Sequence, residues 1–547
     1  MRPHGARGLW LAGAIAIGLT HASGAQGVRP YRPAFDVSDY ALTIDLPDSG
    51  STIQGTAVLS VERTMRADTL TLDLVGLHVY SVSVNREPAR FVRDSATIAI
   101  ALPRSRRTRE FYEVTVEYGG AVTDGLIARS DSAGRWTYFG DNWPNRARYW
   151  IPSIDHPSDK ATVTWRVRAP MRQTVVANGK LLSRNPIAGG RTETVWRETQ
   201  PIPVYLMVIA AAPLVRYDLG ETDCGMALLQ RCVDQAVYTA PEQSNFMPGP
   251  FLRAPGIIEF FSHIIGPFPY EKLAHLQSST RFGGMENATA IFYADEPFRD
   301  HTMRDGVIAH ETAHQWFGDA VTEREWAHLW LSEGFATYMA ALWTRASRGD
   351  SAFKAEMAGI RNTVLEDTVS VTTRPVIDTA QTNYLALLDR NSYQKGGFVL
   401  QMLRAQIGEG AFFDGLREYY KAHRNGTALT DDLRQAMEHT SHQKLGWFFD
   451  QWLRRPGYPV VTAYWAYNPA AHDVTVDVLQ SSRFGTFRFP LTVAVVDSSG
   501  AEHRARVEMP AVADLGQRIH VPVSAAPDQV ILDPDVELLA VLKVLKR

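Results

Sequence analysis

Two histidines in one predicted helix have the spacing of a metal site. His310 and His314 are four positions apart, so both imidazoles lie on one face of a helix and can bind a single ion. Glu311 lies about 100° further around the helix, where it can reach a water on that ion and act as a general base. Glu333 follows in a second predicted helix, with Ser332 as its expected N-cap. Two histidines and one carboxylate leave a fourth position for water, which is typical of a catalytic zinc site. We therefore predict one Zn2+ per chain, bound by His310, His314 and Glu333.

A glycine-rich segment upstream carries a further carboxylate. Gly283 and Gly284 precede Met285, Glu286 and Asn287. Two adjacent glycines let a substrate backbone approach closely, and an edge segment at this point can pair with an extended peptide. Glu286 would then lie beside the zinc ion. The alternative interpretation is that the glycine pair simply forms a turn.

The elements that must position these residues change in character along the chain. Residues 36–215 alternate apolar and polar side chains over short runs separated by turn clusters, which is typical of half-buried antiparallel strands. Residues 251–452 have helical periodicity instead, and strand-like alternation returns after Pro459. We therefore predict a multidomain chain with an N-terminal all-β domain, a mostly α catalytic domain and a C-terminal β-sandwich.

The predicted domain boundaries follow these changes in pattern. Residues 26–217 form the N-terminal antiparallel β domain, residues 218–457 the catalytic domain, and residues 458–547 the C-terminal β-sandwich domain.

The start of the chain has the order of a secretory signal peptide. Positively charged residues precede an apolar run from Leu9 to Leu19, and small residues up to Ala25 supply a cleavage site. The apolar run is shorter than the roughly 20 residues that a membrane span needs. We therefore expect residues 1–25 to be a signal peptide and the chain to be exported, either to a periplasm or out of the cell, with no stable membrane span.

The composition narrows the class of protein. The chain has 547 residues, of which 45% are hydrophobic and 21% charged, and this excludes a disordered protein. Lys+Arg 56 against Asp+Glu 59 gives a net charge of −3, so the general basic character of a nucleic-acid-binding protein is absent. In an exported chain, Cys224 and Cys232 would form a small disulfide loop, with two free thiols as the alternative.

Taken together, these motifs resemble the gluzincin aminopeptidases of the M1 family. The resemblance rests on the zinc-binding helix, on Glu333 and on the Gly-Gly-Met-Glu-Asn segment, and it extends over roughly residues 36–460. Further matching motifs are Pro157-Ser-Asp-Lys-Ala-Thr162, Asn391-Ser-Tyr-Gln-Lys-Gly-Gly397, Phe448-Phe-Asp-Gln-Trp452 and Pro456-Gly-Tyr-Pro459. The resemblance implies a thermolysin-like catalytic domain.

The resemblance also implies a role for each matching residue. His310, His314 and Glu333 would be the zinc ligands, with Glu311 as the general base. Glu286 would hold the free ammonium group of a peptide, so that single N-terminal residues are removed. The neighbouring Gly283, Gly284, Met285 and Asn287 would line the substrate backbone. Tyr393 would stabilise the tetrahedral oxyanion, where a phenol donor is most effective.

One position departs from the family pattern. Many members have a glutamate or glutamine in the first domain that contacts the ammonium group a second time, and Trp143 occupies that position here. The neighbouring Asp141 or Asn142 would have to take over this contact. Two further functions remain as alternatives: a thermolysin-like endopeptidase, and a non-catalytic peptide-binding protein that keeps the fold.

Overall fold

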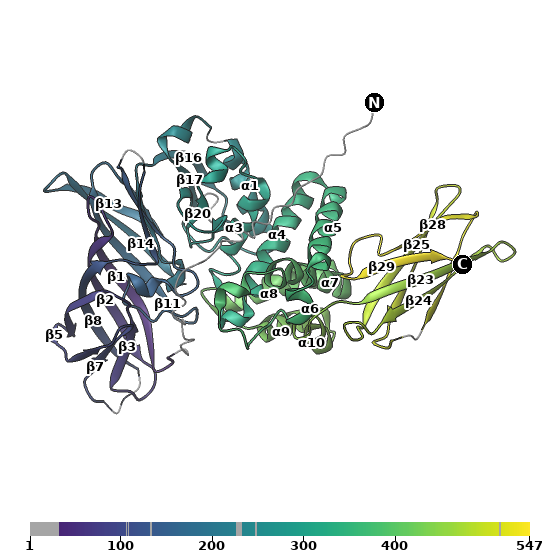
Figure 1. Ribbon diagram of the computed structural model, residues 1–547, viewed down its shortest axis with the longest axis horizontal. Coiled ribbons are helices and arrows are strands. Elements are labelled where there is room, and N and C mark those ends of the chain that lie inside the picture. The colour runs from purple at the N-terminus through teal and green to yellow at the C-terminus, as the bar shows by residue number, and fades with distance from the viewer. Residues whose placement is uncertain are drawn as a thin grey trace.

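The computed structural model describes residues 32–547 except 106, 108, 132–133, 226–231, 247–248 and 514–515. Along the chain, a β-rich N-terminal part is followed by a helical middle part and a β-rich C-terminal part, which lie side by side in this order (Figure 1). The predicted signal peptide, residues 1–25, lies outside the described residues.

The N-terminal part is built on an eight-stranded sheet with the order β13-β14-β11-β1-β2-β8-β4-β5. Its strands, in chain order, are β1 (Phe35–Asp45), β2 (Thr52–Arg63), β4 (His78–Val84), β5 (Glu87–Pro88), β8 (Glu110–Ala121), β11 (Lys160–Pro170), β13 (Lys180–Ile187) and β14 (Arg191–Pro203). β1 pairs antiparallel with β2 and parallel with β11. Tyr40, Leu42 and Ile44 of β1 are buried, and this alternation is the period-two pattern of a strand with one face on the core.

Two smaller sheets complete the N-terminal part, a four-stranded sheet of order β12-β15-β10-β9 and a three-stranded sheet of order β3-β7-β6. Their strands are β3 (Thr69–Asp73), β6 (Phe91–Arg93), β7 (Thr97–Ala101), β9 (Leu126–Ser130), β10 (Trp136–Gly140), β12 (Thr174–Ala177) and β15 (Ile209–Ala212). The connection between β10 and β11, residues 141–159, contacts the middle part through a hydrogen bond from the Ser158 hydroxyl to the Arg324 carbonyl.

The middle part opens with a five-stranded sheet of order β16-β17-β18-β20-β19. Its strands are β16 (Val215–Thr222), β17 (Val233–Thr239), β18 (Lys272–Ser278), β19 (Gly284–Met285) and β20 (Ala290–Ala294). The boundary predicted between residues 217 and 218 falls inside β16. β19 lies at the edge of this sheet, which matters for the site described below.

Helices make up most of the remainder of the middle part. They are α1 (Ala254–Ile264), α2 (Glu296–Arg299), α3 (Asp305–His314), α4 (Trp330–Arg348), α5 (Asp350–Glu366), α6 (Ser370–Thr373), α7 (Gly396–Ile407), α8 (Glu409–His423), α9 (Thr430–Ser441) and α10 (Gly446–Leu453). Gly349 and Gly408 end α4 and α7 with positive φ angles, as glycine does at helix C-termini. None of the helices in the described part of the chain is long and apolar enough to cross a membrane.

The C-terminal part consists of two facing sheets of order β27-β24-β23-β29 and β26-β25-β28. Their strands are β23 (Val460–Asn468), β24 (Asp473–Ser481), β25 (Phe489–Asp497), β26 (Glu502–Met509), β27 (Gln517–Pro522), β28 (Pro527–Leu532) and β29 (Val541–Lys546). An ion pair of 2.8 Å between Arg361 on α5 and Asp533 ties this part to the helices. The predicted fold class is therefore confirmed.

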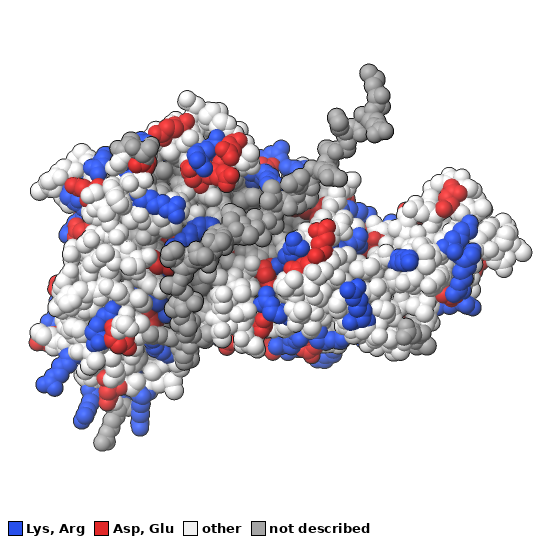
Figure 2. All heavy atoms as spheres, in the orientation of Figure 1, with Lys and Arg blue, Asp and Glu red and all other residues white. Residues whose placement is uncertain are grey.

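Charged side chains are distributed without a dominant sign. On the face shown in Figure 2, basic and acidic groups are interspersed over all three parts, consistent with the net charge of −3. Cys224 and Cys232 are joined in a disulfide, the first of the two states considered from the sequence.

Candidate active site

The three predicted metal ligands converge from two helices. His310 and His314 project from α3, and Glu333 projects from the first turn of α4. The Nε2 atoms of the histidines are 3.2 Å apart, and each is 3.3 Å from Oε2 of Glu333. Donors about 2.0–2.2 Å from a tetrahedral zinc ion lie about 3.3–3.6 Å from one another. The observed donor set therefore fits a zinc ion.

The ligands shift one another's pKa values. Burial acts to raise the pKa of Glu333, but His314 and hydrogen bonds from both imidazoles outweigh it and lower that pKa to about 2. Glu333 in turn raises the pKa of His314 to about 10, against the effect of burial. A carboxylate held ionised between two imidazoles is a suitable ligand for a divalent cation.

The outer nitrogen of His314 has two protein partners. Its Nδ1 lies 2.9 Å from the Ser332 hydroxyl oxygen and 3.2 Å from the Phe317 carbonyl oxygen. Partners of this kind fix the ring orientation of metal-binding histidines. The predicted role of Ser332 as a helix cap is wrong, because α4 begins earlier, at Trp330, and makes no side-chain cap hydrogen bond.

Tyr393 lies beside the ligands in an irregular turn. It belongs to a π-helical segment, η7 (Asn391–Lys395), and such segments recur at functional sites. Its hydroxyl donates a 2.7 Å hydrogen bond to Oε1 of Glu333, and its ring stacks on His310 with centroids 5.9 Å apart. Burial, together with Glu333, raises the pKa of Tyr393 well above its ordinary value. The phenol therefore stays protonated and able to donate.

A close crossing of α4 and η7/α7 brings Tyr393 to Glu333. A Cβ atom on Gly334 would lie 2.9 Å from the backbone carbon of Gly396, and one on Gly397 would lie 3.2 Å from the Gly334 carbonyl oxygen. Only glycine permits backbones to approach this closely. The glycines at this crossing thus set the distance between the elements that carry Glu333 and Tyr393.

Glu311 occupies space that glycine leaves free. A Cβ atom on Gly284 would lie 2.1 Å from Oε1 of Glu311, whereas one on Gly283 would meet nothing within 4 Å. The two glycines therefore differ: Gly284 makes room for the Glu311 carboxylate, and Gly283 is open to solvent. Burial, with Glu286 and Glu333 nearby, raises the pKa of Glu311 well above its ordinary value.

The segment around Glu286 forms the edge of a sheet. β19 pairs with β20 on one side only, so its other side can receive an extended peptide. Ligand atoms of Glu286, Glu311 and His314 lie within 4.8 Å of one another, so the carboxylate of Glu286 is next to the metal ligands. Burial raises the pKa of Glu286 to about 7; His314 opposes this rise, and nearby carboxylates add to it.

The other residues predicted to line the substrate differ in access. Gly283 is exposed and Gly284 half-buried, but Met285 and Asn287 are 3% and 0% exposed. Because these fractions cover backbone and side chain together, Met285 and Asn287 offer almost no surface to a peptide. Gln315, which sequence reasoning missed, fixes this segment: its amide donates to the Glu286 carbonyl at 2.9 Å, and its Oε1 accepts from the Thr289 N–H at 2.8 Å.

The two candidates for a second ammonium contact have different surroundings. Both side-chain ends of Asn142 are engaged, since its amide donates to the Met207 carbonyl at 2.7 Å and its oxygen accepts from the Trp150 indole at 2.8 Å. Asp141 is buried and close enough to Glu286 to help raise the pKa of that group. Arg146 lies 2.9 Å from one oxygen of Asp141.

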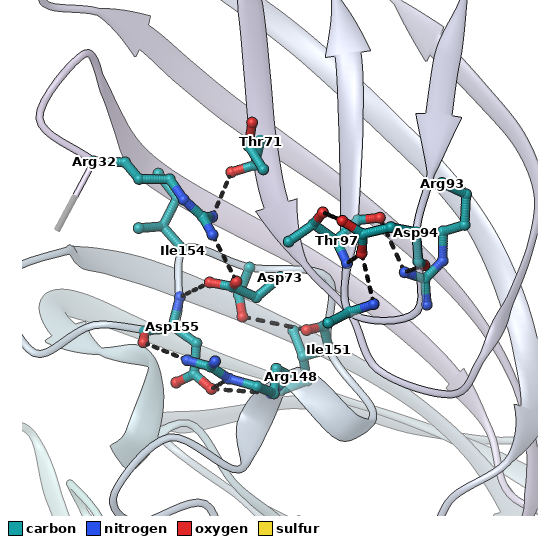
Figure 3. Close-up of polar contacts among 12 residues, drawn as sticks. Arg32, Thr71, Asp73, Arg93, Asp94, Thr97, Arg148, Ile151, Ile154 and Asp155 are labelled. Carbon is teal, nitrogen blue, oxygen red and sulfur yellow. Dashed lines mark hydrogen bonds and ion pairs between the residues drawn. The ribbon is translucent and has the colours of Figure 1, made fainter. Parts of the chain in front are cut away.

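Polar contacts hold the connection that carries Asp141. Asp73 accepts hydrogen bonds from the Arg32 guanidinium at 2.9 Å and from the Asp155 N–H at 3.3 Å. Arg148 pairs with the carboxylate of Asp155 at 2.9 Å, so the later part of this connection is anchored on β3 (Figure 3). Near the start of the connection, Trp143 packs edge-on against Trp326 with ring centroids 5.4 Å apart. A rigid connection of this kind holds side chains at fixed positions beside the metal ligands.

Family models match both of the parts that build this site. The model described as the peptidase M1 N-terminal domain matches residues 37–206, and the peptidase family M1 domain matches residues 253–452. Together these regions make up more than half of the chain.

Individual relatives and solved structures agree with these matches. A probable aminopeptidase 2 of Sulfurisphaera tokodaii is 28% identical over 71% of this chain and 50% of its own length. The tricorn protease-interacting factor F2 of Thermoplasma acidophilum is 26% identical over 81% of this chain and 56% of its own. The chain thus spans about half the length of these relatives. The crystal structure of an M1 zinc metallopeptidase from Deinococcus radiodurans matches with a TM-score of 0.66 and 26% identity, covering 77% of this chain and 93% of that one.

Proposed function

Because the chain belongs to peptidase family M1, we propose that it is a zinc-dependent aminopeptidase that removes single residues from peptides with a free N-terminus. One observation carries the proposal: the carboxylate of Glu286 lies beside His314 and Glu311, at the edge strand where a peptide can bind. A carboxylate at this place is suited to bind the ammonium group of a peptide. It would then limit the peptide to one residue on the N-terminal side of the cleaved bond.

The metal would be a single zinc ion held by His310, His314 and Glu333. When bound there, zinc polarises a carbonyl oxygen and makes water a better nucleophile. The remaining chemistry falls to side chains of the protein. Glu311 takes a proton from the attacking water and returns it to the leaving amine. The Tyr393 hydroxyl, released from Glu333, donates to the oxyanion that develops on the substrate.

Substrate binding would use backbone and carboxylate groups. The free edge of β19 pairs with the peptide backbone, and the exposed Gly283 lets that backbone approach. Glu286 binds the ammonium group. We assign the second ammonium contact to Asp141 rather than Asn142. Asn142 is hydrogen-bonded at both ends of its side chain, whereas Asp141 pairs closely with Arg146 through one oxygen and has Arg281 only at 3.8 Å from the other.

A thermolysin-like endopeptidase is the second candidate, since two histidines and a glutamate would serve it equally well. It requires a site that accepts chain on both sides of the reactive bond. The buried carboxylate of Glu286 disfavours this function, because an uncharged peptide segment at that place would not offer it the positive partner that a free N-terminus supplies.

We also propose that the chain is exported, with residues 1–25 as its signal peptide. The charge and hydrophobicity pattern of that segment supports the proposal. So does the disulfide between Cys224 and Cys232, since such bonds persist in oxidising compartments.

Hydrolysis of aminoacyl-p-nitroanilides and their N-acetylated counterparts tests the proposed activity. We expect cleavage of the free-amine compounds only, with loss of activity on chelation and recovery on adding zinc. Equal cleavage of acetylated compounds would support the endopeptidase. Absence of cleavage by the zinc-loaded protein over a broad panel would support a binding function.

A further inference from the structure

The turn that follows the metal-binding helix determines where His314 points. Residues 317–320 leave α3 with a φ of +120° at Gly318, and the Phe317 carbonyl contacts Nδ1 of His314 at 3.2 Å. A Cβ atom on Gly318 would lie 2.3 Å from the Ser332 hydroxyl and 3.2 Å from His314 Nδ1. Any movement of this 317–320 turn would therefore change the partners of a zinc ligand.

The N-terminal part of the chain holds that turn with a lysine. Lys160 is the first residue of β11. Its ammonium donates to the carbonyls of Asp319, Ala320 and Gly426 at 2.8, 2.9 and 3.1 Å. An ammonium group has three hydrogens, so all its donors are used on this one region. Two of the three acceptors belong to the 317–320 turn.

Tyr205 contacts the same turn from a second place. It lies in the short helix η2 (Val204–Leu206), is 2% exposed, and its hydroxyl donates to the Gly318 carbonyl at 3.3 Å. Lys160 and Tyr205 therefore bind three successive carbonyls, those of Gly318, Asp319 and Ala320. Neither residue contacts a zinc ligand itself.

Charge gives the lysine a second effect. Asp319 and Glu323 are 0% and 1% exposed, and both interact electrostatically with Lys160. Removing the ammonium would take away its favourable interaction with both buried carboxylates, which favours a rearrangement of the turn.

We propose that Lys160 and Tyr205 are positioning residues for the zinc centre, acting through the 317–320 turn on His314. The proposal rests on the proposed zinc-dependent function. It assigns to the N-terminal β domain a part in metal binding in addition to its contact with the segment after Glu286. That second contact is made by Asn178 and Gly179, which bond to Ala288 and Thr289.

Lys272 provides a matched control at the same domain interface. Lys272 belongs to β18 of the middle part and reaches into the N-terminal part. Its ammonium donates to the Ala177 carbonyl at 2.7 Å and lies 4.5 Å from the centre of the Trp196 ring. It is 5% exposed and makes no hydrogen bond to the 317–320 turn. Lys272→Met therefore removes one lysine contact between the domains without touching the support of His314.

The experiment compares the full-length protein with Lys160→Met, Tyr205→Phe and Lys272→Met. Zinc affinity is measured by competition with a chelator, and the visible spectrum of the cobalt-substituted proteins reports the geometry around the metal. We expect Lys160→Met to bind zinc about tenfold more weakly, in the range for partners of metal ligands, with an altered cobalt spectrum. Tyr205→Phe should shift both readouts in the same direction by a smaller factor. Lys272→Met should lower the melting temperature but keep the zinc affinity and the spectrum.

The kinetic readout separates positioning from substrate binding. Lys160→Met should lower kcat at saturating zinc with KM unchanged, because Glu286 and β19 are untouched. Unchanged zinc affinity and cobalt spectra in both Lys160→Met and Tyr205→Phe would overturn the inference. The two residues would then only hold the N-terminal part against the middle part. Tyr205→Phe removes a single oxygen atom and still decides the matter should Lys160→Met fail to fold. A wild-type protein that binds no zinc would refute the proposed function as well.

Discussion

At the centre of the site, Glu311 fills the space that a side chain at position 284 would occupy. The carboxylate oxygen of Glu311 lies where a side chain at position 284 would begin, only 2.1 Å from the expected Cβ. The neighbouring Gly283 has open space around it. Adding a methyl group would therefore have opposite consequences at these two adjacent positions: it would collide with Glu311 at position 284 and meet nothing at position 283.

Gly284→Ala should displace Glu311, the proposed general base, without unfolding the protein, because the end of a glutamate side chain can move while backbone cannot. General acid–base catalysis contributes about 10²–10⁴ to a rate, so we expect kcat to fall by at least about 10². Gly283→Ala is the matched variant: it leaves Glu311 in place and should keep a kcat close to wild type, with any effect confined to KM because Gly283 faces the peptide backbone. Steady-state kinetics with melting temperatures checks both, and a Gly284→Ala enzyme with wild-type kcat would refute this role.

At the scale of elements, the crossing of α4 with η7 and α7 brings Tyr393 to Glu333. Because Gly334 meets the backbone of Gly396, a side chain there cannot be accommodated by rotating a neighbour. The two elements must instead move apart, and the 2.7 Å hydrogen bond from Tyr393 to Glu333 would lengthen.

Gly334→Ala should therefore destabilise the protein although alanine is the better helix former. We expect a loss of about 1–3 kcal/mol from overpacking, partly offset by about 1 kcal/mol of helix propensity. Gly410→Ala on α8, where a Cβ meets nothing within 4 Å, should instead be neutral or stabilising. Urea unfolding of the two variants measures the difference, and equal stabilities would contradict the close crossing.

Local patterns predicted the elements well because they depend on neighbours in the sequence. The spacing of His310 and His314 is enough to place both imidazoles on one helix face, and the alternation in β1 is enough to predict a strand. The role of Ser332, the difference between Gly283 and Gly284, and the hold of Lys160 on the 317–320 turn were not predictable in this way. Each depends on a contact between segments far apart in the chain.

For the whole molecule, a buried histidine links stability to pH. His275 lies in β18 of the five-stranded sheet, is 0% exposed, and bonds through Nδ1 to the Tyr293 hydroxyl at 2.9 Å. Burial lowers its pKa from 6.5 to about 3. Between these two pH values His275 is protonated in the unfolded chain but not in the folded chain. The free energy of unfolding therefore decreases as the pH falls below 6.5.

Between pH 7 and pH 5 this single group should cost about 2 kcal/mol of unfolding free energy. His275→Phe cannot titrate, so its stability should fall by about that much less over the same interval, even if it is less stable at pH 7. Urea unfolding at the two pH values gives the comparison. Parallel pH dependence in both proteins would show that His275 is not the group responsible.

The central claim is that the site recognises a free N-terminus and removes one residue at a time. Its most direct test is mass spectrometry of the products from a short peptide of known sequence, supplied with a free and with an acetylated N-terminus to the zinc-loaded enzyme. We predict a ladder of peptides shortened one residue at a time from the free N-terminus, and no change in the acetylated peptide. Internal fragments from either peptide would contradict the assignment of Glu286 as the ammonium-binding group.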